Sequence, residues 1–226
     1  MNLLDLFGAY LGIMTMGFMF LPALQVLEWK KKGTTGGYSS VQFVLPCLMM
    51  SCWMCHGLLT GDPLNTYLNA FSLIVSSVYI LAFAYYTPDI KYLAYQVTGL
   101  VALLVAIFVY VFACPKEEQI DTMGKIAAIA QNAGLVGALV QLKQVFETKT
   151  TEFVPAEMQF GILFIVGQWT VFAVLSGNMY MAAGNLPGIV LALFTIGLYY
   201  VYPPLTWKVP ILGVGHAQKM DEKKKK

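Results

Sequence analysis

The chain has 226 residues, of which 58% are hydrophobic and only 12% are charged, and its mean hydropathy is +0.66. A soluble globular domain carries about 25% charged residues, so this composition excludes an ordinary soluble domain and points to a lipid bilayer. The net charge of +2 comes without the clustered basic and aromatic residues that indicate a nucleic-acid partner, and we expect none.

Seven uncharged apolar runs follow one another along the chain, each close to the length of about 20 residues that crosses roughly 30 Å of hydrocarbon. They cover residues 6–27, 41–60, 64–86, 92–114, 126–142, 158–176 and 179–203. Turn-forming or charged residues separate the runs, and no break leaves room for a soluble domain. The sequence therefore predicts an all-α membrane protein with seven transmembrane helices and with its termini on opposite sides.

The first three runs recur in the last three at a fixed offset of 116 residues, the difference between Trp53 and Trp169. The fourth run has no counterpart. Because three crossings reverse the direction of the chain, one extra crossing lets the second copy start in the original orientation. We therefore predict two parallel three-helix bundles joined by a linker helix, a 3+1+3 arrangement.

This arrangement divides the chain into four parts. Residues 1–87 form the first repeat, 88–122 the linker helix and its loop, 123–207 the second repeat, and 208–226 a basic tail. Lysine supplies all 14 positive charges, and only Lys116 and Lys125 lie outside when the N-terminus is placed outside. Because positive charge favours the cytoplasmic side, we expect the N-terminus outside and the tail in the cytoplasm.

The final run Lys223–Lys226 has two interpretations. A solvated inner tail follows from the charge bias of membrane proteins. The same lysines also resemble a dilysine retrieval signal for the early secretory pathway, an address of the kind found at C-termini. We expect the plasma membrane, with the Golgi or another endomembrane as the alternative.

Metal, cofactor and catalytic signals are weak in this sequence. Its four cysteines, Cys47, Cys52, Cys55 and Cys114, provide a single CxxC spacing with no second pair and lie within or beside apolar runs, so we expect free thiols and no metal. We find no catalytic Ser-His-Asp set and no phosphate-binding glycine loop. We therefore expect neither an enzyme nor a cofactor.

Trp53 and Trp169 are candidate substrate-binding residues because they occupy equivalent positions in the two copies, among small and polar neighbours. An indole ring can lie against the C–H face of a sugar while its N–H meets a polar partner. The alternative for each is an interfacial tryptophan at the membrane border. Symmetric placement at the repeat offset favours the binding role.

Asn69 and Asn185 form a second equivalent pair, each about 8 to 9 Å deep in its helix at about 1.5 Å per residue. A buried amide needs a hydrogen-bond partner. The alternative is a contact that joins neighbouring helices. Two amides at equal depth near two indoles indicate a pocket for a neutral polyol.

The chain resembles the SWEET family of sugar transporters over roughly residues 5–207. In the first copy the resemblance rests on Phe20-Leu21-Pro22, Thr34-Thr35, Trp53-Met54-Cys55-His56-Gly57 and Asn69. In the second copy it rests on Leu142-Lys143-Gln144-Val145, on the segment from Thr148 to Pro155, on Gln168-Trp169 and on Gly184-Asn185. Each motif is weak by itself, but together, in this order and at matched spacing, they make the resemblance specific.

The resemblance implies that Trp53, Asn69, Trp169 and Asn185 bind the sugar. It also implies that Met49 and Ile165, one turn before the tryptophans, line the pocket and influence its size, although apolar packing is the favoured explanation for such residues in an apolar helix.

Pro22 and Pro155 match two of the four prolines at which family members bend. The other two positions hold Gln42 and Ala138, with Pro46 one turn beyond Gln42, so the gating that the family implies is in doubt. His56 stands where the family usually has tyrosine, and we expect a structural position near the interface, with pH sensing as the alternative.

No interior of the seven runs contains Asp, Glu, Lys or Arg, whereas ion-coupled carriers normally bury such groups. We therefore predict facilitative, uncoupled and bidirectional movement of a monosaccharide or disaccharide by alternating access. The expected partners are the sugar and the lipid bilayer, and a homo-oligomer is left open. The alternatives are a carrier of the PQ-loop type for another small solute and a seven-helix receptor without transport.

Overall fold

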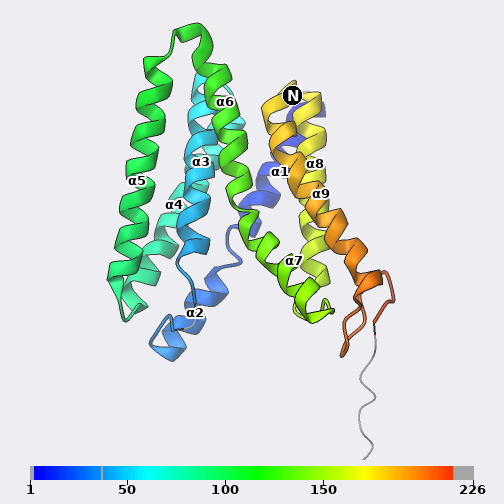
Figure 1. Ribbon diagram of the computed structural model, residues 1–226. Helices are drawn as coiled ribbons and strands as arrows, with labels where there is room; N and C mark the ends of the chain where they lie inside the picture. Colours follow the sequence, from blue (N-terminus) through cyan, green and yellow to red (C-terminus); the bar gives the residue numbers. More distant parts are fainter. Residues whose placement is uncertain (1–2, 37, 216–226) are drawn as a thin grey trace, which may run out of the picture.

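The computed structural model describes residues 3–36 and 38–215, which form nine α-helices (Figure 1). The helices are α1 (Leu3–Phe18), α2 (Ala23–Lys32), α3 (Val41–Thr60), α4 (Pro63–Tyr86), α5 (Ile90–Ala113), α6 (Lys116–Ala133), α7 (Val136–Thr148), α8 (Ala156–Leu175) and α9 (Met179–Val201). The lysine run 223–226, with its two interpretations, lies outside the described residues.

Among the described residues, six segments are long and apolar enough to cross a membrane: Leu3–Lys32, α3, α4, α5, α8 and α9. The first of them contains α1 and α2, which are separated by a short turn at residues 19–22. The predicted run 126–142 is not among the six. It is divided between α6 and α7 at Gly134 and Leu135.

Helix α6 begins ten residues before the predicted run, at Lys116 rather than 126, so only Cys114 and Pro115 connect it to α5. The residues that suggested a loop are Glu117, Glu118 and Asp121, which form the first turns of the helix instead. Acidic residues are favourable at a helix N-terminus because of the helix dipole. The charge pattern therefore marks the start of a helix and not a loop.

The helix bounds repeat at the offset found in the sequence. Shifting α3 by 116 gives 157–176, against 156–175 for α8, and shifting α4 gives 179–202, against 179–201 for α9. Equivalent helices run in the same direction, which can be followed from the N-terminus and from the α5–α6 turn in Figure 1. The loop hydrogen bonds repeat as well, with Thr35 N–H bonded to Tyr86 O and Thr151 N–H bonded to Tyr202 O.

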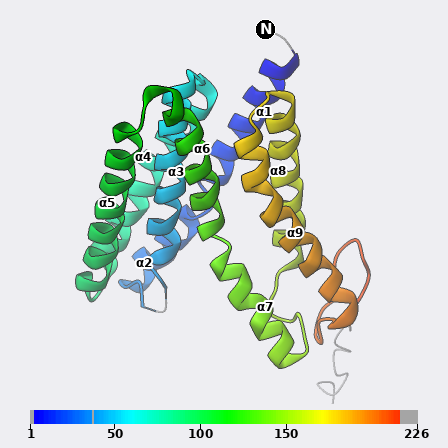
Figure 2. The same cartoon turned by 45° about the horizontal axis from the view of Figure 1, so that its top comes forward.

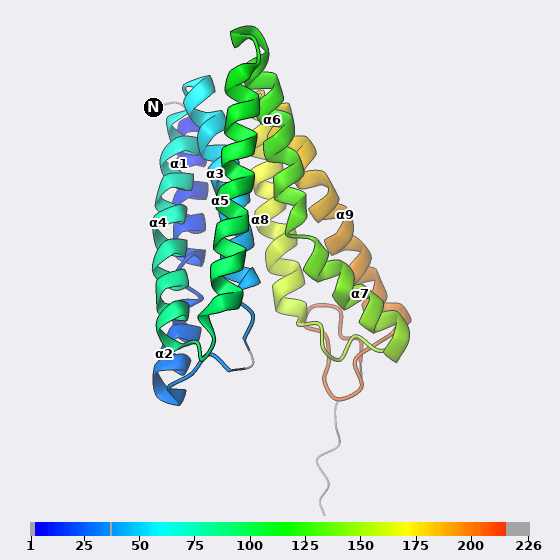
Figure 3. The same cartoon turned by 60° about the vertical axis from the view of Figure 1, so that its left-hand side comes forward.

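The helices pack in the same order within each copy. Helix α4 packs against α1 and α3, and its counterpart α9 packs against α6 and α8. The main contacts between the copies are α3 with α6 and α1 with α8, and each is the image of the other under the offset. The contact between α3 and α6 is much more extensive than the contact between α1 and α8. Helix α5 lies to one side, against α3 and α6 (Figures 2 and 3).

Gly8 and Gly124 occupy equivalent positions where helices approach closely. A Cβ atom at Gly8 would lie 2.9 Å from both Leu64 and Phe172, and one at Gly124 would lie 2.5 Å from the ring of Tyr180. These glycines therefore allow α1 and α6 to approach the helices that carry the asparagines. The repeated glycine in the sequence reflects this packing requirement.

The turns at the same end of the molecule, directly before α4 and α9, are also equivalent. Gly61 and Gly177 adopt positive φ angles of 68° and 75°, a conformation that glycine adopts without strain. Asp62 then accepts a hydrogen bond from the N–H of Asn65, and Asn178 accepts one from the N–H of Met181. These side chains cap α4 and α9 and fix the start of both asparagine-bearing helices.

The second copy has an additional contact at the end where α7 is joined to α8. The carboxylate of Glu152 accepts hydrogen bonds from the backbone N–H groups of Leu205 and Thr206 and from the hydroxyl of Thr206. Trp207 in turn donates its indole N–H to the carbonyl of Glu152. We call residues 203–215 the inner strap. It folds back over the α7–α8 loop, whereas the corresponding part of the first copy continues into α5.

Candidate substrate-binding site

A cavity of about 220 Å³ lies between the two copies. It is lined from all six of α1, α3, α4, α6, α8 and α9, and no residue of α5 contributes. The lining residues are Thr15, Met49, Trp53, Asn65, Leu68, Asn69, Gln131, Val166, Trp169, Met181 and Asn185. The structure thus brings Trp53, Trp169, Asn69 and Asn185 together around one space, which we call the central cavity.

Both indoles are held by hydrogen bonds that cross from one copy to the other. Trp53 Nε1 donates to Gln131 Oε1 at 2.9 Å, and Trp169 Nε1 donates to Thr15 Oγ1 at 3.1 Å. Thr15 and Gln131 are themselves separated by 116 residues, so the two bonds are equivalent under the repeat. Each indole is therefore oriented by a polar residue of the opposite copy.

The asparagines differ in their partners. Asn185 is 5% exposed and its Oδ1 accepts a hydrogen bond from Gln131 Nε2. Trp53, Gln131 and Asn185 therefore form one continuous chain. Asn69 is half-buried and donates instead to the carbonyl and side-chain oxygens of Asn65, both at 2.8 Å.

Two buried amide nitrogens beside the central cavity have no hydrogen-bond partner among the described residues, Asn185 Nδ2 and Asn65 Nδ2. Leaving a buried donor unpaired costs about 1 to 3 kcal/mol. A hydroxyl group bound in the cavity could satisfy such a donor. The cavity therefore combines two aromatic faces with amide donors and acceptors, and its lining contains no ionisable side chain.

The predicted size-setting residues are only partly found in the lining. Met49 lines the central cavity, but on the other side the lining residue is Val166 and not Ile165. Trp169 keeps the position equivalent to Trp53, so the difference is confined to the residue about one turn before the indole.

The sequence interpretation missed several lining residues, above all Thr15 and Gln131. Their signal was present, because both lie at the repeat offset and carry polar side chains in apolar helices. Asn65 was also missed. It is four residues before Asn69 on the same face of α4, the spacing at which helical side chains meet.

Of the two predicted hinge prolines, Pro22 closes the turn between α1 and α2, and Pro155 immediately precedes α8. Gln42, at an expected hinge position, instead donates a hydrogen bond to Gln25 of α2. Ala138 is inside α7, yet the helix is interrupted nearby at Gly134. An interruption of this helix thus occurs without proline.

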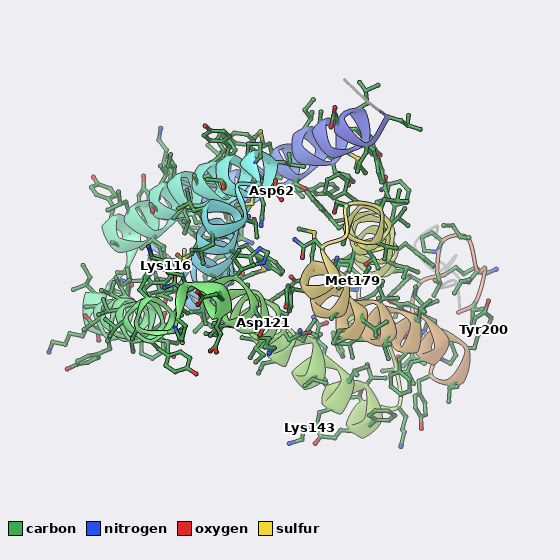
Figure 4. The ribbon with its side chains drawn as sticks, turned by 90° about the horizontal axis from the view of Figure 1, so that it is seen from above. Asp62, Lys116, Asp121, Lys143, Met179 and Tyr200 are labelled. Carbon is green, nitrogen blue, oxygen red and sulfur yellow. The ribbon has the colours of Figure 1, made fainter. Side chains whose placement is uncertain are left out.

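A second cavity of about 430 Å³ lies next to the central one, toward the α3–α4 and α8–α9 turns. We call it the outer vestibule. His56 lines it one turn beyond Trp53, and Phe172 lines it one turn beyond Trp169. Their rings pack edge-on to the indoles, with ring centroids 5.5 and 5.7 Å apart. Figure 4 looks down on this end, with Asp62, Asp121 and Met179 arranged around the middle of the molecule.

These features define the class of the molecule as an integral, multi-pass helical membrane protein with a polar cavity between two repeated halves. Residues 5–91 and 121–206 both match the family model described as "Sugar efflux transporter for intercellular exchange". The chain belongs to this family, the SWEET or MtN3 family, as the sequence resemblance predicted. The two matched segments leave out most of α5.

The chain is similar to the mouse protein named Sugar transporter SWEET1, with 26% identity over 198 residues, which cover 85% of this chain and 88% of that protein. It is also 27% identical over 178 residues to the rice protein named Bidirectional sugar transporter SWEET12, covering 76% of this chain and 59% of that protein. A solved structure of a eukaryotic SWEET transporter superposes with a TM-score of 0.73 at 17% identity, covering 89% of this chain and 99% of that one. The last comparison confirms the all-helical fold.

Proposed function

We propose that this protein is a facilitative sugar transporter that moves sugar in both directions through the central cavity. The observation that carries the proposal is the pairing of two indoles with two asparagines across the repeat interface. A sugar offers C–H faces to the indoles and hydroxyl groups to the amides. The relatives named as sugar transporters, from a mouse and a rice protein, support the same substrate class.

The volume of the central cavity favours one sugar ring over two in this conformation. Its volume of about 220 Å³ is below the range of about 300 to 1,000 Å³ that is typical of sites for drug-sized ligands. Met49 from one copy and Val166 from the other contribute apolar side chains to its lining. We therefore propose a monosaccharide as the preferred cargo.

The proposed transport is uncoupled. The lining of the central cavity has no Asp, Glu, Lys, Arg or His that could bind a coupling ion. In proteoliposomes with an imposed pH gradient, sugar should equilibrate to equal concentrations inside and outside. Accumulation that follows the pH gradient would show coupling and rule out this part of the proposal.

For the mechanism, we propose seven crossings in a 3+1+3 arrangement, with α1–α2, α3 and α4 as one bundle and α6–α7, α8 and α9 as the other. Helix α5 would be the linker, which its position outside the cavity lining supports. The bundles would rock about the sugar to give alternating access. The interruptions at residues 19–22 and at Gly134 are the proposed bending points, with Pro155 as a third.

We propose that the end bearing the N-terminus and the outer vestibule faces the outside or the organelle lumen. Lys30, Lys149 and Lys208 lie at the opposite end of the molecule, which supports a cytoplasmic position for that end. The plasma membrane is the proposed compartment. Surface biotinylation of intact cells would distinguish it from the Golgi.

The test of the binding site is replacement of Asn185 by Ala, because this residue contributes both a free donor and the end of the Trp53–Gln131 chain. Uptake of radiolabelled glucose into proteoliposomes should fall to background. Ser77→Ala, an exposed side chain of α4 outside the cavity, is the matched control and should keep uptake. Persistent uptake by a well-folded Asn185→Ala protein would show that the site is wrongly assigned.

A further inference from the structure

The outer vestibule is built from equivalent residues of the two copies, but their chemistry differs. His56 corresponds to Phe172, Thr60 to Ser176, and Asp62 to Asn178 at the offset of 116. The vestibule also lies directly beside the central cavity, since His56 packs against Trp53 and Tyr180 adjoins Met181. A solute moving between the outer end and the central cavity along this side would pass the ring of His56.

His56 is only 2% exposed, and neither of its ring nitrogens has a hydrogen-bond partner among the described residues. A buried polar atom without a partner costs about 1 to 3 kcal/mol. The contacts of the ring are instead the edges of two aromatic rings, Trp53 at 5.5 Å and Tyr180 at 5.9 Å between centroids. Packing alone does not require an imidazole here, because its repeat counterpart Phe172 packs in the same way against Trp169.

The other polar side chains that line the vestibule already have partners. Thr60 and Ser176 donate to carbonyl groups of their own helices. Asp62 and Asn178 accept from backbone N–H groups as helix caps, and Tyr180 donates to Asp121. Among the polar side chains described in this cavity, His56 is therefore the exception, because both nitrogens of its buried ring lack a hydrogen-bond partner.

We propose that the outer vestibule is a second binding site for the transported sugar, in which the imidazole of His56 bonds one or two sugar hydroxyls. A neutral imidazole has one donor nitrogen and one acceptor nitrogen, so it matches a hydroxyl group, which can both donate and accept. The oxygen atoms of Thr60 and Ser176 and the amide of Asn178 can add weaker contacts. The vestibule, at about 430 Å³, has room for a sugar ring. This proposal rests on the sugar-transport function proposed above.

The test measures whether glucose protects a cysteine placed in the vestibule from chemical labelling. Ser176→Cys is a nearly isosteric change at an exposed lining position, and Cys114→Ser in the same protein removes the one native cysteine outside the buried set. A membrane-impermeant methanethiosulfonate reagent is applied to proteoliposomes with and without glucose. Glucose at half saturation should slow the labelling rate about twofold.

Three further variants separate the vestibule from the central cavity. Protection should persist in Asn185→Ala, in which central binding is disabled. It should disappear in His56→Phe, which keeps a ring of the kind found at Phe172, and return in His56→Gln, which keeps a donor and an acceptor. Elution of each variant as a single peak in detergent shows that it is folded.

Absent protection in a protein that transports glucose would overturn the vestibule site and leave the proposed function standing. Protection that is lost in Asn185→Ala would also overturn it, because the cysteine would then report binding in the central cavity. Protection that is unchanged in His56→Phe would overturn it as well, because His56 would then not bind the sugar. Failure of the unmodified protein to transport any sugar would instead contradict the proposed function.

Discussion

The two halves of the central cavity use the same positions and differ in how tightly those positions are held. On one side Trp53, Gln131 and Asn185 form a buried hydrogen-bonded chain, in which the indole is 4% exposed and the asparagine 5%. On the other side Trp169 bonds to Thr15 while Asn69 bonds separately within its own helix, and both Trp169 and Asn69 are half-buried.

Two differences between the copies explain this contrast. Gln131 is long enough to reach both Trp53 and Asn185, whereas the shorter Thr15 bonds only to Trp169. Asn65 supplies Asn69 with oxygen acceptors inside the same helix, whereas the equivalent position of the second copy is Met181. The repeat thus fixes where polar groups stand, and single side chains decide which groups remain free for a substrate.

The largest effect should come from breaking the hydrogen-bonded chain. Gln131→Ala leaves Trp53 Nε1 and Asn185 Oδ1 without partners, at a cost of about 1 to 3 kcal/mol each. Thr15→Ala removes one bond on the more open side and should destabilise less. Thermal unfolding of the two purified variants compares them directly. Equal losses of stability would show that the two halves are held equally.

A smaller effect should separate Val166 from Ile165. Val166→Phe places a large ring in the central cavity and should lower glucose uptake about tenfold, equivalent to about 1.4 kcal/mol. Ile165→Phe alters a position outside the lining and should retain more uptake. If Ile165→Phe lowered uptake more than Val166→Phe, Ile165 would be the residue that sets the size of the pocket, as the sequence predicts.

Giving the first copy the residues of the second at positions 15 and 65 should change the unfolding stability, and the change should depend on both substitutions together. Asn65→Met removes the side-chain acceptor of Asn69 and leaves only the backbone carbonyl of residue 65, and Thr15→Gln supplies a longer side chain in the manner of Gln131. The double variant should be more stable than the sum of the single changes predicts, by about 0.5 to 3 kcal/mol. A double-mutant cycle of unfolding stability measures this coupling. Strict additivity would mean that Thr15→Gln does not reach Asn69.

The smallest effect concerns the inner strap of the second copy. The hydroxyl of Thr206, followed by the backbone N–H groups of Leu205 and Thr206, lowers the pKa of Glu152 below its ordinary value of 4.5. A lowered pKa means that the strap is held above pH 4.5 and released as the pH falls through the lower value in the folded protein. Hydrogen exchange in residues 203–215, corrected for its intrinsic pH dependence, should therefore rise in acid.

Glu152→Gln should produce faster exchange of the strap at neutral pH. Glu147→Gln is the matched control, since Glu147 is an exposed glutamate that pairs with Lys143 within α7. The loop bond between Thr35 and Tyr86 in the first copy should not respond to either change. Exchange that is independent of both pH and Glu152 would contradict this role.

Much of the fold and the four principal cavity residues were predictable because they repeat. The offset located Trp53, Trp169, Asn69 and Asn185, and hydropathy located six of the seven predicted spans. Helix α6 was misjudged because its charged first turns hide it from a hydropathy search. The cross-copy bonds of Thr15 and Gln131, and the lining by Val166 instead of Ile165, depend on side-chain reach and on the detailed packing of the helices, which the sequence pattern does not specify.

Counterflow in proteoliposomes tests the central claim most directly. Vesicles containing the protein are loaded with an unlabelled solute, and entry of the same radiolabelled solute is followed for a panel of hexoses, disaccharides and amino acids. The proposed function predicts a transient accumulation of at least one hexose and none of the amino acids. Counterflow of amino acids alone would identify a carrier for another solute, and binding of sugar without any counterflow would identify a receptor.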